Sequence, residues 1–140
     1  MGLNQSILKV NFENIQNIIK YNVNNNTNNQ HYLINTLTNN EQNCLIYGTI
    51  DSQEEEKLIN SLIKNGIQKE IIIILYGKNS NDNTLLKKYN QLMNLGFSNV
   101  YVYFGGLFEW LLLQDIYGKE LFPTTTKELD ILKYKPLSDL

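Results

Sequence analysis

The sequence feature that most constrains the fold is a run of five apolar residues, Ile71 to Leu75, four of which are isoleucine. A continuous β-branched run of this kind is typical of a strand that is buried on both faces of a parallel sheet. The strand ends at Gly77, a polar segment from Lys78 to Asn83 follows, and apolar residues then recur with helical spacing. The stretch from Glu70 to Leu95 therefore predicts a buried strand, a loop and an amphipathic helix.

The loop after this strand is the predicted ligand-binding site. In open α/β sheets, ligands bind where a central strand ends and the next helix begins, because backbone N–H groups and the helix dipole converge there. A second turn, which contains the adjacent glycines Gly105 and Gly106, also joins a predicted strand to a predicted helix. Two glycines permit positive φ and a close approach of the backbone. The candidate ligand-binding residues of the two turns are Gly77, Lys78, Asn79, Ser80, Asn81, Asp82, Asn83, Gly105 and Gly106.

The rest of the chain alternates predicted strands with predicted helices. Short apolar or alternating runs predict further strands at Ser6 to Val10, Tyr32 to Leu37, Cys44 to Ile50 and Asn99 to Tyr103. Helices are predicted to begin after Asn11, Ser52, Asn83 and Gly106. Such alternation indicates βαβ units, and we expect an α/β fold with about five mostly parallel strands and helices on both faces.

Three predicted helix starts carry capping signals. Asn11 is expected to cap the first helix, and Ser52 and Glu55 have the spacing of a capping box at the start of the second. Thr125 and Glu128 repeat this spacing near the C-terminus. They predict a further short helix that packs on the surface.

The length and composition suit one compact domain. The chain has 140 residues, 42% of them hydrophobic, which is enough for one core and leaves no room for a second. We expect a single domain over residues 1–140, with its core at about 7–118 and with 119–140 as a C-terminal extension packed on the surface. The net charge of −2 offers no basic face, so nucleic acid is not expected as a partner.

The scarcity of some residue types limits the chemistry. The sequence contains no arginine, so a guanidinium group cannot bind phosphate or carboxylate. The one cysteine, Cys44, excludes an internal disulfide, and with His31 as the one histidine a metal site would need a carboxylate cluster that is not visible. We therefore expect no metal, no other cofactor and a reducing compartment, the cytoplasm.

The N-terminus carries a pattern for lipid attachment. Residues 1–6, MGLNQS, fit the M-G-x-x-x-[ST] pattern for myristoylation of Gly2. One acyl chain binds membranes only marginally, and Lys9 is the one basic residue nearby, so the implied membrane association is weak. No apolar run approaches the ~20 residues that a membrane-spanning helix needs.

The second half of the chain carries an ordered set of motifs. A strand ending in Ile-Leu-Tyr-Gly is followed by the polar loop, by a helix that closes at Leu95-Gly96-Phe97, and by the segment from Val100 to Trp110. This order resembles the second half of a rhodanese-like domain. The resemblance covers about Ile7 to Gly118, and the segments FGGLFEWLLLQDIYG and FPTT are also similar to small rhodanese-like proteins of protists and large DNA viruses.

The resemblance implies a sulfurtransferase fold that has lost its chemistry. Active rhodaneses carry a cysteine directly after the tyrosine of the central strand, in a cradle of N–H groups that lowers its pKa and holds the persulfide; here that position is Gly77. Sulfur transfer needs a thiolate, which glycine cannot supply. The segment LINTL at residues 33–37 matches a strand that usually ends in Asp-x-Arg, and both charged residues are absent. Cysteine-dependent phosphatases of this fold also need that cysteine and an arginine.

Two classes of function follow from these observations. The first is a catalytically inactive rhodanese-like module that acts as a binding or regulatory domain, with a protein partner or a small anion at loop 77–83 and Lys78 as the charged contact. The alternative is an active sulfurtransferase or other transferase that uses Cys44 or Ser80 as its nucleophile. Ser80 lies in the loop without a neighbouring histidine, and Cys44 lies at the start of a predicted strand rather than at a helix N-terminus.

Overall fold

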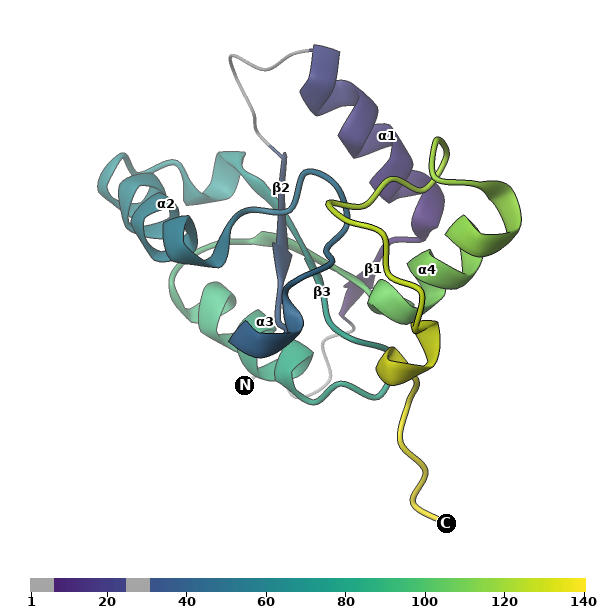
Figure 1. Cartoon of the computed structure of the whole chain (residues 1–140). Coiled ribbons are helices and arrows are strands. Elements are labelled where there is room, and N and C mark those ends of the chain that lie inside the picture. The colour runs from purple at the N-terminus through teal and green to yellow at the C-terminus, as the bar shows by residue number, and fades with distance from the viewer. Residues whose placement is uncertain (1–6, 25–30) are drawn as a thin grey trace.

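A four-stranded parallel sheet forms the centre of the fold (Figure 1). The computed structural model describes residues 7–24 and 31–140. The strands are β1 (Leu8–Lys9), β2 (His31–Asn35), β3 (Ile72–Tyr76) and β4 (Asn99–Tyr103). Their order in the sheet is β1-β4-β3-β2, and every neighbouring pair is parallel. The predicted α/β class with a parallel sheet is therefore confirmed.

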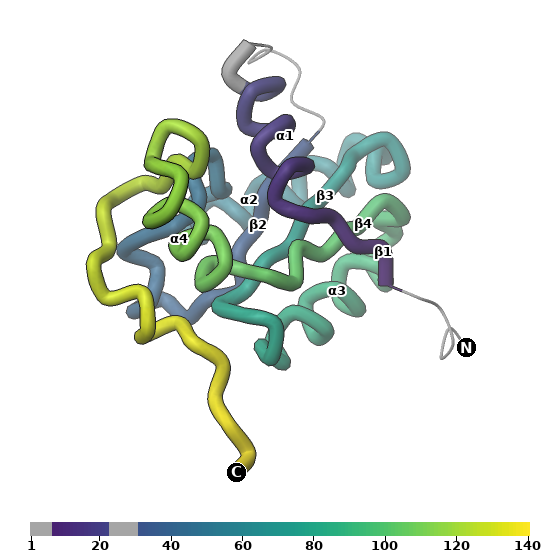
Figure 2. Tube along the Cα trace, turned by 90° about the vertical axis from the view of Figure 1, so that its right-hand side faces the viewer, coloured from purple at the N-terminus to yellow at the C-terminus, as the bar shows by residue number. Residues whose placement is uncertain are grey.

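Two helices cover each face of this sheet. The helices are α1 (Phe12–Asn24), α2 (Ser52–Lys64), α3 (Thr84–Asn94) and α4 (Gly106–Tyr117). Helices α1 and α4 lie on one side of the strands, and α2 and α3 lie on the other (Figure 1 and Figure 2). A parallel sheet needs this cover because both of its faces are apolar. The expectation of helices on both faces is confirmed.

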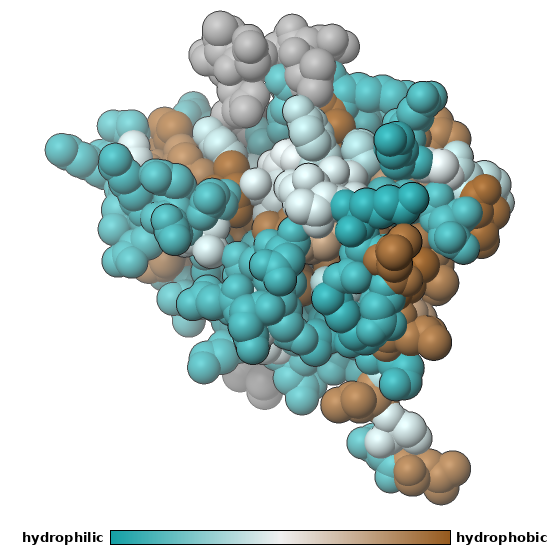
Figure 3. Space-filling view, in the orientation of Figure 1, coloured by the Kyte–Doolittle hydropathy of each residue, from teal (hydrophilic) through white to brown (hydrophobic). Residues whose placement is uncertain are grey.

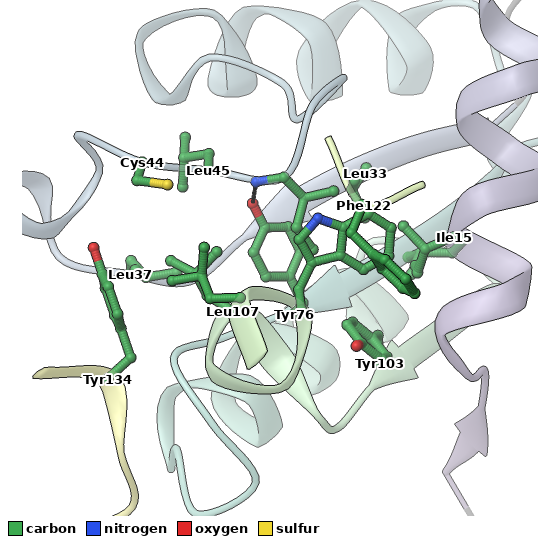
Figure 4. Packing of buried hydrophobic residues seen from close by; sticks show 14 residues of the cluster. Ile15, Leu33, Leu37, Cys44, Leu45, Tyr76, Tyr103, Leu107, Phe122 and Tyr134 are labelled. Carbon is green, nitrogen blue, oxygen red and sulfur yellow. Dashed lines mark hydrogen bonds between the residues drawn. The ribbon is translucent and has the colours of Figure 1, made fainter. Parts of the chain in front are cut away.

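Strand β3 joins the two halves of the core. Ile74 and Tyr76 pack into the cluster under α1 and α4, whereas Ile73 and Leu75 pack under α2 and α3, and all four are at most 1% exposed. Alternate side chains of a strand point to opposite faces, so both faces of β3 are buried. Figure 4 shows the first cluster, in which the Tyr76 hydroxyl accepts a hydrogen bond from Ile46 N (3.1 Å).

The segment Cys44 to Ile50 does not form the predicted strand. It makes only isolated single-residue bridges, one to β2 and one to the C-terminal segment. Tyr47 N donates to Pro123 O (3.0 Å), and Leu45 N donates to Thr125 Oγ1 (3.0 Å). Because these donors are satisfied by the C-terminal segment, the chain touches β2 only beside Leu33 and does not add a strand to the sheet. The sheet therefore has four strands instead of the expected five or so.

The first helix is capped as predicted, and the second is capped one residue earlier than predicted. Asn11 Oδ1 accepts a hydrogen bond from Glu13 N (3.0 Å) at the start of α1. At the start of α2, Asp51 Oδ1 accepts from Gln53 N (2.8 Å), so the cap is Asp51 and not the predicted capping box at Ser52. A carboxylate is a stronger acceptor for these backbone donors than a hydroxyl group.

The predicted capping box near the C-terminus does not begin a helix. Thr125 Oγ1 accepts a hydrogen bond from the segment before α2, and Glu128 Oε2 accepts from Asp130 N (3.1 Å). Both side chains are therefore committed to other donors. Only a short 3₁₀ helix, Ile131–Tyr134, follows them.

The chain after Gly118, which was expected to pack on the surface, also contributes to the core. Phe122 and Tyr134 are 3% and 1% exposed. Trp110 of α4 is fully buried, and its Nε1 donates to Pro123 O (3.1 Å). The C-terminal segment thus satisfies the one polar group of the largest buried side chain.

None of the helices in the described part of the chain is long and apolar enough to cross a membrane. Gly2, the predicted site of myristoylation, lies outside the described residues. Its acylation stays a prediction.

Candidate functional site

The loop between β3 and α3 lies against the turn before α4. Leu107 N donates to Gly77 O (3.0 Å), and Phe108 N donates to Lys78 O (3.0 Å). Gly106 has a φ of +68°, and a Cβ atom at this position would lie 2.7 Å from the Gly77 carbonyl oxygen. Position 106 therefore needs glycine for its backbone conformation and for the close approach of the two turns. The two groups of predicted site residues meet at the carboxyl end of the sheet.

The carboxylate of Asp82 fills the centre of the loop. Its Oδ2 accepts a hydrogen bond from Lys78 N (2.9 Å), and its Oδ1 accepts from Thr84 N (3.0 Å) and Thr84 Oγ1 (2.5 Å). A Cβ atom added at Gly77 would collide with this carboxylate and would lie 2.9 Å from Thr36 Oγ1. The space into which a side chain at position 77 would project is therefore occupied by Asp82.

Asn79 accepts hydrogen bonds from two further amides of the loop. Its Oδ1 accepts from Asn81 N (2.9 Å), its Nδ2 donates to Tyr134 O (2.8 Å), and the residue is only 6% exposed. Asp82 N donates to Asn79 O (3.3 Å). The backbone N–H groups of Lys78, Asn81 and Asp82 thus have acceptors inside the loop. An external anion that bound one of these three N–H groups would have to displace its acceptor.

The side chain of Lys78 is already paired. Its Nζ lies 2.5 Å from Glu41 Oε2, and the two side chains are 31% and 30% exposed. The hydrogen bond from Lys78 is the main cause that lowers the pKa of Glu41 below its ordinary value. Glu41 comes from the segment between β2 and α2, so the predicted charged contact of the loop has a counter-ion from a different part of the chain.

The two candidate nucleophiles lie in unfavourable places for catalysis. Cys44 is 1% exposed, its thiol donates to Thr126 O (3.4 Å), and it belongs to the core cluster drawn in Figure 4. Ser80 is exposed in the loop. His31 begins β2 and pairs with the first residue of β3, so it lies at the opposite end of the sheet from Ser80. His31 therefore cannot serve as a general base for Ser80.

A groove runs beside the loop. It has a volume of about 900 Å³ and lies between the loop, α3 and the C-terminal segment. Charged and apolar side chains both line it, among them Glu41, Lys78, Asp82, Leu86, Phe104 and Leu137. Within residues 7–24 and 31–140, no group of three or more His, Cys, Asp and Glu side chains is placed to hold a metal ion. The lining of the groove is therefore mixed in polarity.

A buried tyrosine and a glutamate support the turn before α4. Tyr103 Oη donates to Glu109 Oε2 (2.5 Å), and a side chain at Gly105 would collide with the same glutamate. Burial raises the pKa of Tyr103 well above its ordinary value, and the hydrogen bond to Glu109 raises it further. Glu109 thus has a partner within the domain and is engaged in holding the turn.

Sequence reasoning missed the groups that close the loop. It places Asp82 among the ligand-binding residues, and in the structure Asp82 is itself the acceptor for the loop's amides. The spacing of Asp82 and Thr84 at a helix start is a local signal for this role, because an aspartate accepts from the N–H two residues on. Glu41 and Thr36 carry no such signal, since they reach the loop only through the tertiary fold.

The fold and the loop together define an open parallel α/β domain whose candidate site lies at the carboxyl ends of its central strands. The sequence model of the rhodanese-like domain family matches residues 15–113, which is most of the chain. The protein therefore belongs to the rhodanese-like domain family. None of the curated proteins compared with it by sequence matches.

Solved structures share this fold. The Alr3790 protein from Anabaena superposes with a TM-score of 0.57 at 18% identity, over 89% of this chain and 97% of that one. Ygr203w, a yeast protein tyrosine phosphatase of the rhodanese family, gives 0.63 at 12% identity over 89% and 96%. The As-Sb reductase from Leishmania major gives 0.53 at 16% identity over 80% and 79%. At these identities the similarity is one of fold.

Proposed function

We propose that this protein is a rhodanese-like module without sulfurtransferase activity that acts as a binding or regulatory domain. The observation that carries the proposal is the Asp82 carboxylate, which occupies the space beside Gly77. The resemblance to active rhodaneses assigns their nucleophilic cysteine to this position, directly after Tyr76. Sulfur transfer needs a thiolate there. Glycine supplies none, and the neighbouring carboxylate takes the room of a bound sulfur atom.

The placement of the two alternative nucleophiles supports the same proposal. Cys44 is buried and bonded to a backbone carbonyl, so a substrate would reach its thiol only after the core opens. Ser80 is accessible, but a serine hydroxyl needs an adjacent base to become a nucleophile. His31 lies too far along the sheet to be that base.

The binding role is assigned to loop 77–83 and the groove beside it. A protein partner suits this surface, because interfaces combine apolar side chains with a polar and charged rim. A small anion is the second candidate ligand. To bind at Lys78, it would have to displace Asp82 from Lys78 N and compete with Glu41 for the Lys78 ammonium group. The protein partner is therefore the favoured ligand.

A thiosulfate:cyanide sulfurtransferase assay tests the lack of activity. We expect no thiocyanate above the rate without protein, and no cyanolysable sulfur on the protein after incubation with thiosulfate. An active rhodanese serves as the positive control, and Cys44→Ala and Ser80→Ala are the matched variants. Activity in the wild type that either substitution abolishes would overturn the proposal in favour of the transferase alternative.

A further inference from the structure

The first part of the chain after α4 is tied firmly to the rest of the domain. Residues 122–126 lie along the segment that precedes α2, and Tyr47 N donates to Pro123 O (3.0 Å). Thr125 and Leu45 exchange two hydrogen bonds, one from Thr125 N to Leu45 O (2.8 Å) and one from Leu45 N to Thr125 Oγ1 (3.0 Å). Several bonds would have to break together before this part could leave the domain.

The last part of the chain, residues 131–140, is held much more weakly. Among the described residues, one hydrogen bond joins it to the body of the domain, from Asn79 Nδ2 to Tyr134 O (2.8 Å). Its other hydrogen bonds join residues two or three positions apart. A partly exposed ion pair between Lys133 and Glu128 ties it only to the adjoining turn, and such pairs add little stability. Segments with so few bonds open at a low free energy.

Tyr134 is the apolar anchor of this weakly held segment. It is 1% exposed and belongs to the core cluster that Figure 4 shows with Leu37 and Cys44. Its hydroxyl group is buried but has no hydrogen-bond partner in the described part of the chain. A buried polar group without a partner has given up its hydrogen bonds to water, which costs free energy. That cost ends when the segment opens and the hydroxyl group meets solvent.

The leucine side chains of the same segment contribute little to holding it closed. Leu132, Leu137 and Leu140 are all exposed. Figure 1 and Figure 3 show the last residues of the chain extending away from the domain, with apolar side chains on their surface. Because these side chains are in solvent whether the segment is closed or open, their hydrophobic free energy does not favour the closed position.

The segment also forms one wall of the groove beside loop 77–83. Its residues that line this groove are Lys133, Lys135, Leu137 and Asp139. The hydrogen bond that holds the segment comes from Asn79, which is itself a residue of the loop. The position of the segment and the surface of the loop are therefore linked through Asn79.

We propose that residues 131–140 form a strap that opens as a unit about the exposed turn at Asp130, while the rest of the fold stays intact. Opening separates Tyr134 O from Asn79 Nδ2 and removes one wall of the groove. Because the closed strap occupies the Asn79 amide donor and borders the loop, its closure restricts binding there. This consequence rests on the proposed binding function, whereas the opening of the strap does not.

Amide hydrogen exchange of the full chain, resolved by residue with NMR, tests the strap. Lys133 N and Lys135 N report on the strap, and Thr125 N reports on the firmly tied part of the chain. Relative to their intrinsic rates, we expect the strap amides to exchange at least about tenfold faster than Thr125 N. Low concentrations of urea should change the exchange of the strap amides only slightly, because opening the strap exposes little surface.

Asn79→Asp tests the hydrogen bond that holds the strap. The new carboxylate can still accept from Asn81 N, but it cannot donate to Tyr134 O. We expect exchange of the strap amides to become about tenfold faster, the change produced by the loss of one hydrogen bond, and exchange of Thr125 N to change much less. Asn81→Asp is the matched control, because it adds the same charge to an exposed position of the same loop. It should exchange like the wild type.

Tyr134→Phe tests the anchor from the opposite direction. It keeps the aromatic ring and removes the buried hydroxyl group, so exchange of the strap amides should slow by about tenfold. Strap amides that exchange as slowly as Thr125 N in the wild type would overturn the proposal. So would equal effects of Asn79→Asp and Asn81→Asp on the strap amides, or faster exchange in Tyr134→Phe. The measurement needs no ligand and no sulfur substrate, so its outcome is separate from that of the sulfurtransferase assay.

Discussion

The Asp82 carboxylate lies where a side chain at Gly77 would have to be. The same carboxylate accepts hydrogen bonds from Lys78 N and Thr84 N, so it takes the place of a bound anion at the start of α3. Glycine at position 77 and aspartate at position 82 are therefore coupled. The effect of a substitution at one position should depend on the other.

Gly77→Cys should destabilise the fold without creating a sulfurtransferase. The new side chain would collide with Asp82, and adding atoms to a filled site typically costs about 1–3 kcal/mol. Urea unfolding measures the cost, and the thiosulfate:cyanide assay measures activity. Ser80→Cys is the control, because it adds an exposed thiol to the same loop without this collision.

Removing the carboxylate should relieve that collision. In the double variant Gly77→Cys/Asp82→Ala, we expect the loss of unfolding free energy to be smaller than the sum of the single losses by at least about 0.5 kcal/mol, as for residues in contact. If the loss of unfolding free energy in the double variant equals the sum of the two single losses, the two positions do not compete for the same space.

Asp82→Ala should turn the loop into an anion-binding site. The substitution removes the acceptor of Lys78 N and Thr84 N, and convergent N–H groups at a helix start bind oxyanions. Calorimetric titration with sulfate or phosphate should show saturable binding to the variant and none to the wild type. Asp139→Ala removes an equal charge from the same groove and should not bind. Equal binding by both variants would assign the effect to net charge alone.

The pair between Glu41 and Lys78 should stabilise the fold in a pH-dependent way. The folded-state pKa of Glu41 lies below its ordinary value of 4.5. The contribution of the ion pair to the free energy of unfolding is therefore complete above pH 4.5, and it is lost as the pH falls through the folded-state pKa. Since the pair is partly exposed, we expect only about 0.2–1 kcal/mol. The measurement compares the unfolding free energy of wild type and Glu41→Gln at neutral and at acidic pH.

Glu56→Gln provides the control for this comparison. Glu56 is exposed on α2 and makes no ion pair with another of the described residues. Its substitution should change stability much less at neutral pH. A difference between wild type and Glu41→Gln that persists unchanged in acid would contradict the assignment to the ion pair.

Gly106→Ala should cost more stability than Gly66→Ala, although both glycines have a φ of +68°. The left-handed conformation alone costs a non-glycine residue roughly 1–2 kcal/mol. At Gly66 the new methyl group meets open space, whereas at Gly106 it would lie 2.7 Å from Gly77 O. Denaturant unfolding of the two variants therefore isolates the contact between the two turns. Equal losses of unfolding free energy in the two variants would show that the contact between Gly106 and Gly77 O contributes nothing to stability.

Some of the fold is determined by the sequence alone, because the responsible interactions are local. The run Ile71 to Leu75 specifies a strand buried on both faces, and Asn99 to Tyr103 is a strand with the predicted bounds. The polar residues from Lys78 to Asn83 separate β3 from α3 as expected. Periodicity, turn residues and the cap at Asn11 all act between residues a few positions apart.

The tertiary structure decided the rest, because the deciding partners are far apart in sequence. Cys44 to Ile50 has the composition of a strand, yet two of its amides bond to Pro123 and to Thr125, the latter 80 positions away from its donor. The β-propensity of a segment reflects how well its side chains fit a sheet. It does not determine whether a partner strand is available for the segment to pair with. Glu41 likewise reaches Lys78 only when β2 and β3 lie side by side. The closure of the loop by Asp82 is local, because Asp82 accepts from Lys78 N and Thr84 N, but the contacts that Thr36 and Glu41 make with the loop depended on that three-dimensional packing.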